Sequence, residues 1–266
     1  QSDWSSDVCS SDLKYRLILK NTTVSEIQKK YAGSMLGMVW AFLYPLLFLA
    51  VYAMVYAFVF KVNYNDLSTS EYIAVIFCGL IPFLGFSESV STGVPCVTSN
   101  ASLIKNTMFP IELVPVRTVF AAQMTHICGT VILIITVIAI GRFSLFALLS
   151  IVVWVLQIMF EIGLVWVLSS INVMVRDLQN VIALIIIMLM MLSPIAYPVE
   201  SIPAMYSGFL KLNPLYYYIV ANQKLLMYQT MPAKEIWIPM ILMGLGFFVI
   251  GYQFFIRMKR VFVDNV

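Results

Sequence analysis

Charged residues are scarce in this sequence, and the motifs of common catalytic sites are missing. Only 11% of the 266 residues are charged and 61% are hydrophobic, with a mean hydropathy of +0.93; a soluble domain carries roughly 25% charged residues. The sequence contains no GxxxxGK[ST] phosphate loop, no HExxH zinc motif and no GxSxG nucleophile motif. The four cysteines show no CxxC spacing, so we expect neither disulfides nor a metal site. These absences predict an integral membrane protein that is catalytically inert by itself.

Long apolar runs predict six transmembrane helices. A helix needs about 20 apolar residues to cross a bilayer core about 30 Å thick. The expected spans are residues 35–60, 72–90, 116–140, 145–171, 181–196 and 237–256. We therefore expect an all-α integral membrane protein with a single transmembrane domain, residues 14–266, and no separate soluble domain.

The N-terminal segment differs in character from the spans. Residues 1–13 have neither the basic start nor the apolar core of a signal peptide, and we interpret them as a non-native or disordered tail. Residues 14–34 mix basic and apolar side chains, with a candidate break at Asn21 and a candidate capping box formed by Thr23 and Glu26. We expect one or two short amphipathic helices at the membrane interface.

Lysine and arginine indicate the orientation, because cytoplasmic loops carry an excess of these residues. The N-terminal segment, the connections after spans two and four and the C-terminus hold eleven of the 16, and the opposite side holds five. We therefore expect a multi-pass protein of the cytoplasmic (inner) membrane with both termini in the cytoplasm, which requires an even number of spans.

The connection between spans five and six, residues 197–236, is too apolar for an ordinary loop. Asn213 followed by Pro214 is typical of a helix start, and residues 203–211 suit a shorter helix before it. Irregular backbone at membrane depth must be covered by protein or by a water-filled cavity. We expect two re-entrant helices in the outer leaflet, beside a pore.

Span one carries an aromatic residue at every fourth position. The members of this aromatic row are Trp40, Tyr44, Phe48, Tyr52, Tyr56 and Phe60. Each step of four over-rotates an α-helix by ~40°, so the rings would form a slow spiral along the membrane. The rings could pack against other helices, or they could line a path for a sugar chain, because flat rings stack on the C–H faces of sugars. The spacing alone leaves both alternatives open.

Two polar residues lie deep in the expected spans. Glu161 follows Gln157 by four residues, so both lie on one helix face, where they could form structural hydrogen bonds or a functional carboxylate site. His126, the only histidine, is expected to hydrogen-bond to a neighbouring helix.

Short motifs along most of the chain resemble one family, the ABC-2 type permeases that export polysaccharides and polyol phosphates (O-antigen, capsule and teichoic acid). They are KYAGSMLGMVW from residue 30 with Pro45, GLIPF at 79–83, NASLIK at 100–105 with Phe109-Pro110, NVMVRD at 172–177, SPIAYP at 193–198 and NPL at 213–215. The sequence departs from the family pattern at Lys30, where arginine is usual, at Phe83, where tryptophan is usual, and at Gln223-Lys224, where arginine is frequent.

The resemblance implies a homodimeric channel, in contact with membrane lipid, that moves a lipid-linked polysaccharide and binds no nucleic acid. It implies two separate ATP-binding-cassette ATPase subunits that hold ATP and Mg, so that no cofactor is expected on this chain. A drug or small-molecule exporter of the same superfamily is the alternative. A membrane transferase or an ion-coupled carrier would need clustered acidic or histidine residues at membrane depth, and the sequence has few.

The resemblance also assigns roles to particular residues and favours the channel interpretation of the aromatic row. Contact with the ATPase is assigned to Asn100, Ser102, Leu103, Ile104 and Lys105. The cytoplasmic mouth is assigned to Lys30, Arg176 and Asp177. The outer gate is assigned to Pro194, Tyr197, Pro203, Asn213, Pro214, Tyr216 and Tyr217.

Overall fold

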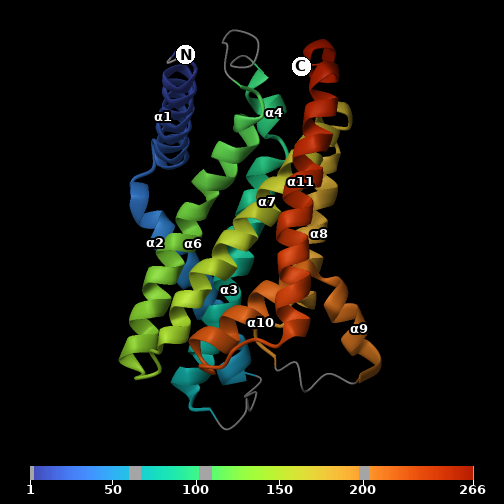
Figure 1. Ribbon diagram of the computed structural model, residues 1–266. Coiled ribbons are helices and arrows are strands. Elements are labelled where there is room, and N and C mark those ends of the chain that lie inside the picture. The colour runs from blue at the N-terminus through green and yellow to red at the C-terminus, as the bar shows by residue number, and fades with distance from the viewer. Residues whose placement is uncertain (1–2, 60–66, 102–109, 198–203, 266) are drawn as a thin grey trace.

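The computed structural model is an elongated bundle of helices (Figure 1). It describes residues 3–59, 67–101, 110–197 and 204–265, and all regular secondary structure in these ranges is helical. The principal helices are α1 (Asp3–Tyr31), α2 (Trp40–Tyr52), α3 (Thr69–Gly93), α4 (Cys96–Ser99), α6 (Leu113–Ala139), α7 (Leu149–Met174), α8 (Leu178–Leu192), α9 (Ala204–Leu212), α10 (Pro214–Leu226) and α11 (Lys234–Asn265). Three shorter elements join them: the 3-10 helices η1 (Gly37–Val39) and η3 (Leu145–Leu148), and the π-helix η2 (Ala53–Val59).

Five of the described helical segments are long and apolar enough to cross a membrane. They are Gly37–Tyr56, Thr69–Gly93, Leu113–Ala139, Leu145–Met174 and Lys234–Lys259, and they coincide with five of the six expected spans. The remaining expected span corresponds to α8, which has only 15 residues. At 1.5 Å per residue such a helix is about 22 Å long, shorter than the hydrocarbon core.

Both chain termini lie at the same end of the bundle, together with α4, and α10 lies at the opposite end (Figure 1). We call these two ends the terminal end and the α10 end. The helix α8 runs from the terminal end toward α9, next to α11 in the view of Figure 1.

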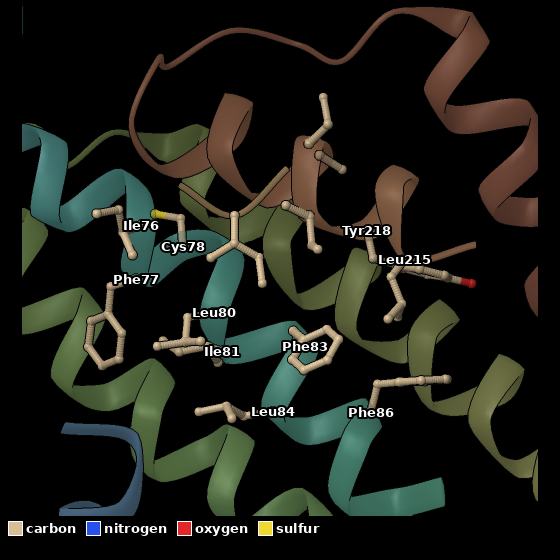
Figure 2. Close-up of a cluster of buried hydrophobic side chains, with 14 of the residues drawn as sticks. Ile76, Phe77, Cys78, Leu80, Ile81, Phe83, Leu84, Phe86, Leu215 and Tyr218 are labelled. Atoms are coloured by element: carbon tan, nitrogen blue, oxygen red, sulfur yellow. The ribbon is translucent and has the colours of Figure 1, made fainter. Parts of the chain in front are cut away.

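The helix α3 forms the centre of the bundle and contacts α6, α7 and α10. Its membrane-length window is 83% buried, against 22–44% for the other four segments. Figure 2 shows its apolar side chains, among them Ile76 and Phe83, gathered with Leu215 and Tyr218 of α10. An apolar helix enclosed on all sides is expected to lie inside the bundle, whereas half-covered apolar helices are expected at the lipid boundary.

Local helix-start signals in the sequence correspond to real caps. Asn213 precedes α10, where its side-chain oxygen accepts from the backbone N–H of Leu215 at 3.0 Å, and Pro214 occupies the first turn. The predicted helix start at this position is confirmed. Ser68 and Glu71 form a capping box at the start of α3, which satisfies backbone N–H groups that have no partner within the helix.

The expected break near Asn21 is wrong, because α1 continues through it without interruption. The Thr22 hydroxyl donates back to the carbonyls of Ile18 at 2.7 Å and Leu19 at 3.1 Å, so its hydrogen bonds are made within the helix and it does not cap a new one. Glu26, expected in a capping box with Thr23, forms an ion pair with Arg117 of α6 instead. The same helix includes residues 3–13, which the sequence analysis set apart.

The two helices α7 and α11 cross with their backbones in direct contact. A Cβ atom added to Gly251 would lie 2.2 Å from the carbonyl oxygen of Gly163, and one added to Gly163 would lie 2.2 Å from that of Phe247. Small residues allow such close approach in membranes, where packing rather than hydrophobic burial holds helices together.

Candidate functional site

The start of the aromatic row and Lys30 line one cavity of about 280 Å³, which we call the terminal-end cavity. The side chains around it come from α1, α2, α3 and α6: Lys30, Tyr31, Trp40, Tyr44, Ser87, Glu88, Ser91 and Thr125. Aromatic rings, hydroxyls and a charged pair therefore meet in one place. Rings of this kind offer an apolar face and, for Tyr and Trp, a hydrogen-bonding edge. This combination suits a sugar, which has apolar C–H faces and polar hydroxyl edges.

The charges in the terminal-end cavity are paired with each other. The Lys30 ammonium donates to the carboxylate of Glu88, which also accepts from the hydroxyl of Thr125. Burial lowers the pKa of Lys30, but the attraction of Glu88 and the hydrogen bond to it outweigh burial and raise the pKa above its usual value of 10.5. Lys30 therefore stays charged at neutral pH and joins α1 to α3. Lys30 and Glu88 are 58 residues apart in the chain, so their pairing could not be recognised from the sequence.

Reversing the pair tests whether it joins α1 to α3. Lys30→Glu or Glu88→Lys alone places two like charges together, and we expect each to lower the yield of folded protein in the membrane fraction. The double variant restores an opposite-charge pair at the same place and should recover most of that yield. The amount of monodisperse protein after extraction is the measurement. A double variant that folds as poorly as the singles would contradict the structural role of the pair.

The next rings of the aromatic row line a second cavity, a groove against α8, although the ring of Phe48 still contacts that of Tyr44 with centroids 4.9 Å apart. The groove has a volume of about 490 Å³ and is lined by Phe48, Tyr52 and Tyr56 together with Met190 and Met191 of α8. The rings of Tyr52 and Tyr56 stack with centroids 5.6 Å apart and planes inclined by 19°. Tyr52 is 9% exposed, so its ring is held within this chain. Phe60 lies outside the described residues.

The π-helix η2 explains the stacking of Tyr52 and Tyr56. Its backbone hydrogen bonds run from i to i+5, so one turn contains more than four residues. Residues four apart then no longer over-rotate as they do in an α-helix, and the ring of Tyr56 returns over that of Tyr52. The slow spiral expected from the sequence therefore ends at Tyr52. Single-turn π segments inside α-helices are frequent at functional sites.

Glu161 is fully buried in a polar cluster between α3, α6 and α7. Its carboxyl oxygens accept from the side-chain amides of Gln123 at 2.7 Å and Gln157 at 2.8 Å. Gln123 also donates to the hydroxyl of Ser89 at 3.0 Å and accepts from the indole N–H of Trp154 at 2.9 Å. The structural alternative therefore fits Glu161, because the bonds of Gln123 to Ser89, Glu161 and Trp154 join α6 to α3 and α7, and Gln157 holds the carboxyl group from within α7.

A hydrogen bond from His126 to a neighbouring helix was expected, and its Nδ1 does not form one. That nitrogen is buried without a hydrogen-bond partner, and the ring stacks on Trp154 of α7 with centroids 5.7 Å apart. Among the described residues no group of three histidine, cysteine, aspartate or glutamate side chains could hold a metal ion. The cysteines at 78, 96 and 128 are buried and free.

The residues assigned to the cytoplasmic mouth do not lie together. Arg176 and Asp177 are exposed in the bend between α7 and α8 at the terminal end. Asp177 precedes α8 but makes no side-chain capping bond. Lys30 lies at the end of α1, on the other flank of the bundle (Figure 1).

Of the residues assigned to ATPase contact, Asn100 is described, and Ser102, Leu103, Ile104 and Lys105 lie outside the described residues. The side chain of Asn100 donates to the carbonyl of Cys96 and accepts from the guanidinium of Arg117 at 2.7 Å. Arg117 is 3% exposed and also forms an ion pair with Glu26 of α1 at 2.9 Å. From the sequence, Arg117 was expected only as one of the cytoplasmic charges. It lies one turn inside an apolar helix, however, and a charged residue at such a position is expected to be buried and paired.

At the α10 end, two of the residues assigned to the outer gate line a groove of about 720 Å³ between α8 and α9. Tyr197 and Asn213 border it, and Asn213 also donates to the Ser193 hydroxyl at 2.9 Å. Tyr216 is buried, and its ring meets that of Tyr217 edge-on at 5.2 Å. Pro194 is buried beside them, Pro214 begins α10, and Pro203 lies outside the described residues.

These features define a helical membrane protein with paired polar groups at its terminal end and an aromatic row in its first long span. The sequence model of the ABC-2 type transporter family matches residues 19–227. The chain belongs to this family, whose members are the transmembrane permease components of ABC transporters.

Curated relatives match most of the chain. The O-antigen export system permease protein RfbA of Klebsiella pneumoniae is 28% identical over 259 residues, 95% of this chain and 98% of the relative. The protein of the same name from Myxococcus xanthus is 27% identical over 225 residues, 84% of this chain and 85% of the relative. The polysialic acid transport protein KpsM of Escherichia coli is 24% identical over 204 residues, 76% of this chain and 78% of the relative.

Proposed function

We propose that this chain is the permease subunit of an ATP-driven exporter that moves a lipid-linked, O-antigen-like polysaccharide across the cytoplasmic membrane. The observation that carries the proposal is the similarity to O-antigen export permeases over 95% of the chain. The terminal-end cavity supports it, because aromatic rings and hydroxyls suited to a sugar meet there.

The proposed topology has six spans, with α8 as the fifth. The position of both termini at one end supports an even number of passes (Figure 1). The buried residues 193–196 extend the short α8 further toward the α10 end. In this topology the terminal end is cytoplasmic and α9 and α10 are re-entrant helices of the outer leaflet.

The proposed exporter contains two copies of this chain and two ATPase subunits. Exposed apolar residues on α8, such as Leu184, Ile187 and Met188, face outward beside the aromatic groove and provide a surface for a second copy. ATP and Mg bind to the ATPase subunits, which contact residues 100–109. The aromatic row would then lie along a channel between the two copies.

The aromatic row gives a direct prediction about transport. Tyr44→Phe and Tyr56→Phe keep the rings and should change export little. Tyr44→Ala and Tyr56→Ala remove a stacking surface worth about 1 kcal/mol, so each should slow export by up to about fivefold and the double variant by more. The rate of appearance of polysaccharide at the cell surface is the measurement, with dimer yield as the control. Unchanged export in the double alanine variant would mean that the row only packs helices.

Reconstitution of export tests the proposed function itself. The chain is produced, together with an ATP-binding-cassette ATPase subunit from the same genome, in a strain that makes a lipid-linked O-antigen but lacks its own exporter. Surface polysaccharide should appear only when both chains are present and the ATPase can hydrolyse ATP. Resistance to small toxic compounds without surface polysaccharide would instead support the drug-exporter alternative.

A further inference from the structure

A pocket opens sideways from the bundle toward the membrane, away from the aromatic row. This lateral pocket has a volume of about 260 Å³ and lies between α3, α6, α7 and α10. Its rim is apolar: Ile127 is 42% exposed, Val131 46% and Ile151 55%. Because α6 and α7 are long and apolar enough to cross a membrane, we expect these exposed side chains to meet hydrocarbon and the pocket to be reached from the bilayer.

A histidine without a hydrogen bond at Nδ1 lines the lateral pocket. His126 is 6% exposed, and a Cβ atom added to Gly85 would lie 2.7 Å from its Nδ1. That side of the ring therefore packs against α3, and the Nε2 end is left for the pocket. No described hydrogen bond involves Nε2, so a ligand hydroxyl in the pocket could supply one there, while Nδ1 stays packed against α3.

The wall formed by α3 offers a second polar group. Pro82 lies inside α3 and has no backbone N–H, so the carbonyl of Cys78 cannot receive the usual bond from the residue four positions later. Both residues line the lateral pocket. Among its described lining residues there is no aspartate, glutamate, lysine or arginine, so a charged ligand would be buried without a counter-ion.

We propose that the lateral pocket binds a small uncharged amphiphile from the bilayer, with an apolar body and one hydroxyl group that bonds to His126. The volume is slightly below the range of drug-sized pockets, about 300–1,000 Å³, and suits a medium-chain alcohol. This site is independent of the cargo that the chain exports.

The lateral pocket is adjacent to the buried polar cluster. Trp154 lines the pocket, stacks on His126 and donates to Gln123, which holds the carboxyl group of Glu161. A ligand that displaces the indole therefore breaks a hydrogen bond of the cluster that joins α3, α6 and α7.

Photolabelling of the full chain in lipid nanodiscs tests the proposal. The probe is an octanol that carries a diazirine, and adducts are mapped by peptide mass spectrometry. We expect saturable adducts at Ile127, Val131 or Ile151 that excess octanol prevents. Val131→Trp fills the pocket and should abolish these adducts. Ile135→Trp, on the same helix at a position 62% exposed and outside the pocket, should leave them unchanged.

The hydroxyl contact has its own test. His126→Phe keeps a ring on Trp154 but removes the nitrogens, and should weaken labelling by the alcohol about fivefold, the effect of one net hydrogen bond. Labelling by an octane diazirine without a hydroxyl should not change. Equal effects on both probes would overturn the hydroxyl contact.

Two further outcomes would overturn the site as a whole. One is labelling spread evenly over the exposed apolar residues of α11, such as Leu242 and Ile250. The other is labelling that persists in Val131→Trp. Thermal unfolding and size exclusion of each variant establish that it is folded, and Ile151→Trp replaces Val131→Trp if the latter does not fold.

Discussion

Gly251→Ala is expected to prevent the bundle from assembling. The new methyl carbon would lie 2.2 Å from the carbonyl oxygen of Gly163 on α7. Overpacked cores usually relax at a cost of about 1–3 kcal/mol because side chains move aside. Here the obstacle is backbone, so the two helices must separate along their whole contact. We expect little folded protein in the membrane fraction. We also expect the extracted protein to lose its single symmetric peak in size exclusion.

Gly246→Ala provides the matched control on the same helix. A Cβ atom at Gly246 would have no neighbour within 4 Å. Since alanine favours a helix over glycine by about 1 kcal/mol, this variant should be as stable as the parent or more so. The same yield and melting temperature for both variants would show that α7 and α11 do not cross as closely as the structure places them.

Leu103→Asp is expected to abolish ATP-dependent export while the chain still folds and assembles. The proposed contact with the ATPase is residues 100–109, and an apolar side chain there would enter a cleft of the partner. A carboxylate in that cleft would be desolvated without a counter-ion, which costs several kcal/mol. Export and co-purification of the ATPase are the two measurements.

Contacts on either side of residues 100–109 explain how a movement of this segment would be transmitted to the membrane-spanning helices. On one side, Arg117 holds Asn100 at 2.7 Å. On the other side, Glu112 pairs with Lys259 of α11 at 2.9 Å, and its carbonyl accepts from the indole of Trp166 at 3.0 Å. A push from the ATPase would therefore be passed directly to α6, α7 and α11.

Ser99→Asp adds the same charge just before the segment and serves as its control. Ser99 is exposed at the end of α4, outside the proposed contact. We expect it to retain export and ATPase binding. Full export by Leu103→Asp would refute the assignment, and loss of export by both variants would point to a general effect of negative charge at this end.

The positions of the long helices could be derived from the sequence alone. A bilayer requires about 20 apolar residues per helix whatever the tertiary contacts are, so five spans were recognisable from composition. The start of α10 was equally accessible, because Asn213 and Pro214 act on backbone groups within two residues of themselves. Family membership followed from motifs that stand in the right order along the chain.

Only the tertiary structure decided how the spans and polar groups meet. The sequence offered Lys30, Glu88, Glu26 and Arg117 as separate charges, and their pairing depends on where α1 lies against α3 and α6. The aromatic row was regular in sequence, yet its first two rings line one cavity and the next three line another, and η2 changes the helical period only after Tyr52. Solvent and local backbone chemistry act on each segment separately, whereas ion pairs, helix crossings and cavities arise when residues distant in the chain come into contact.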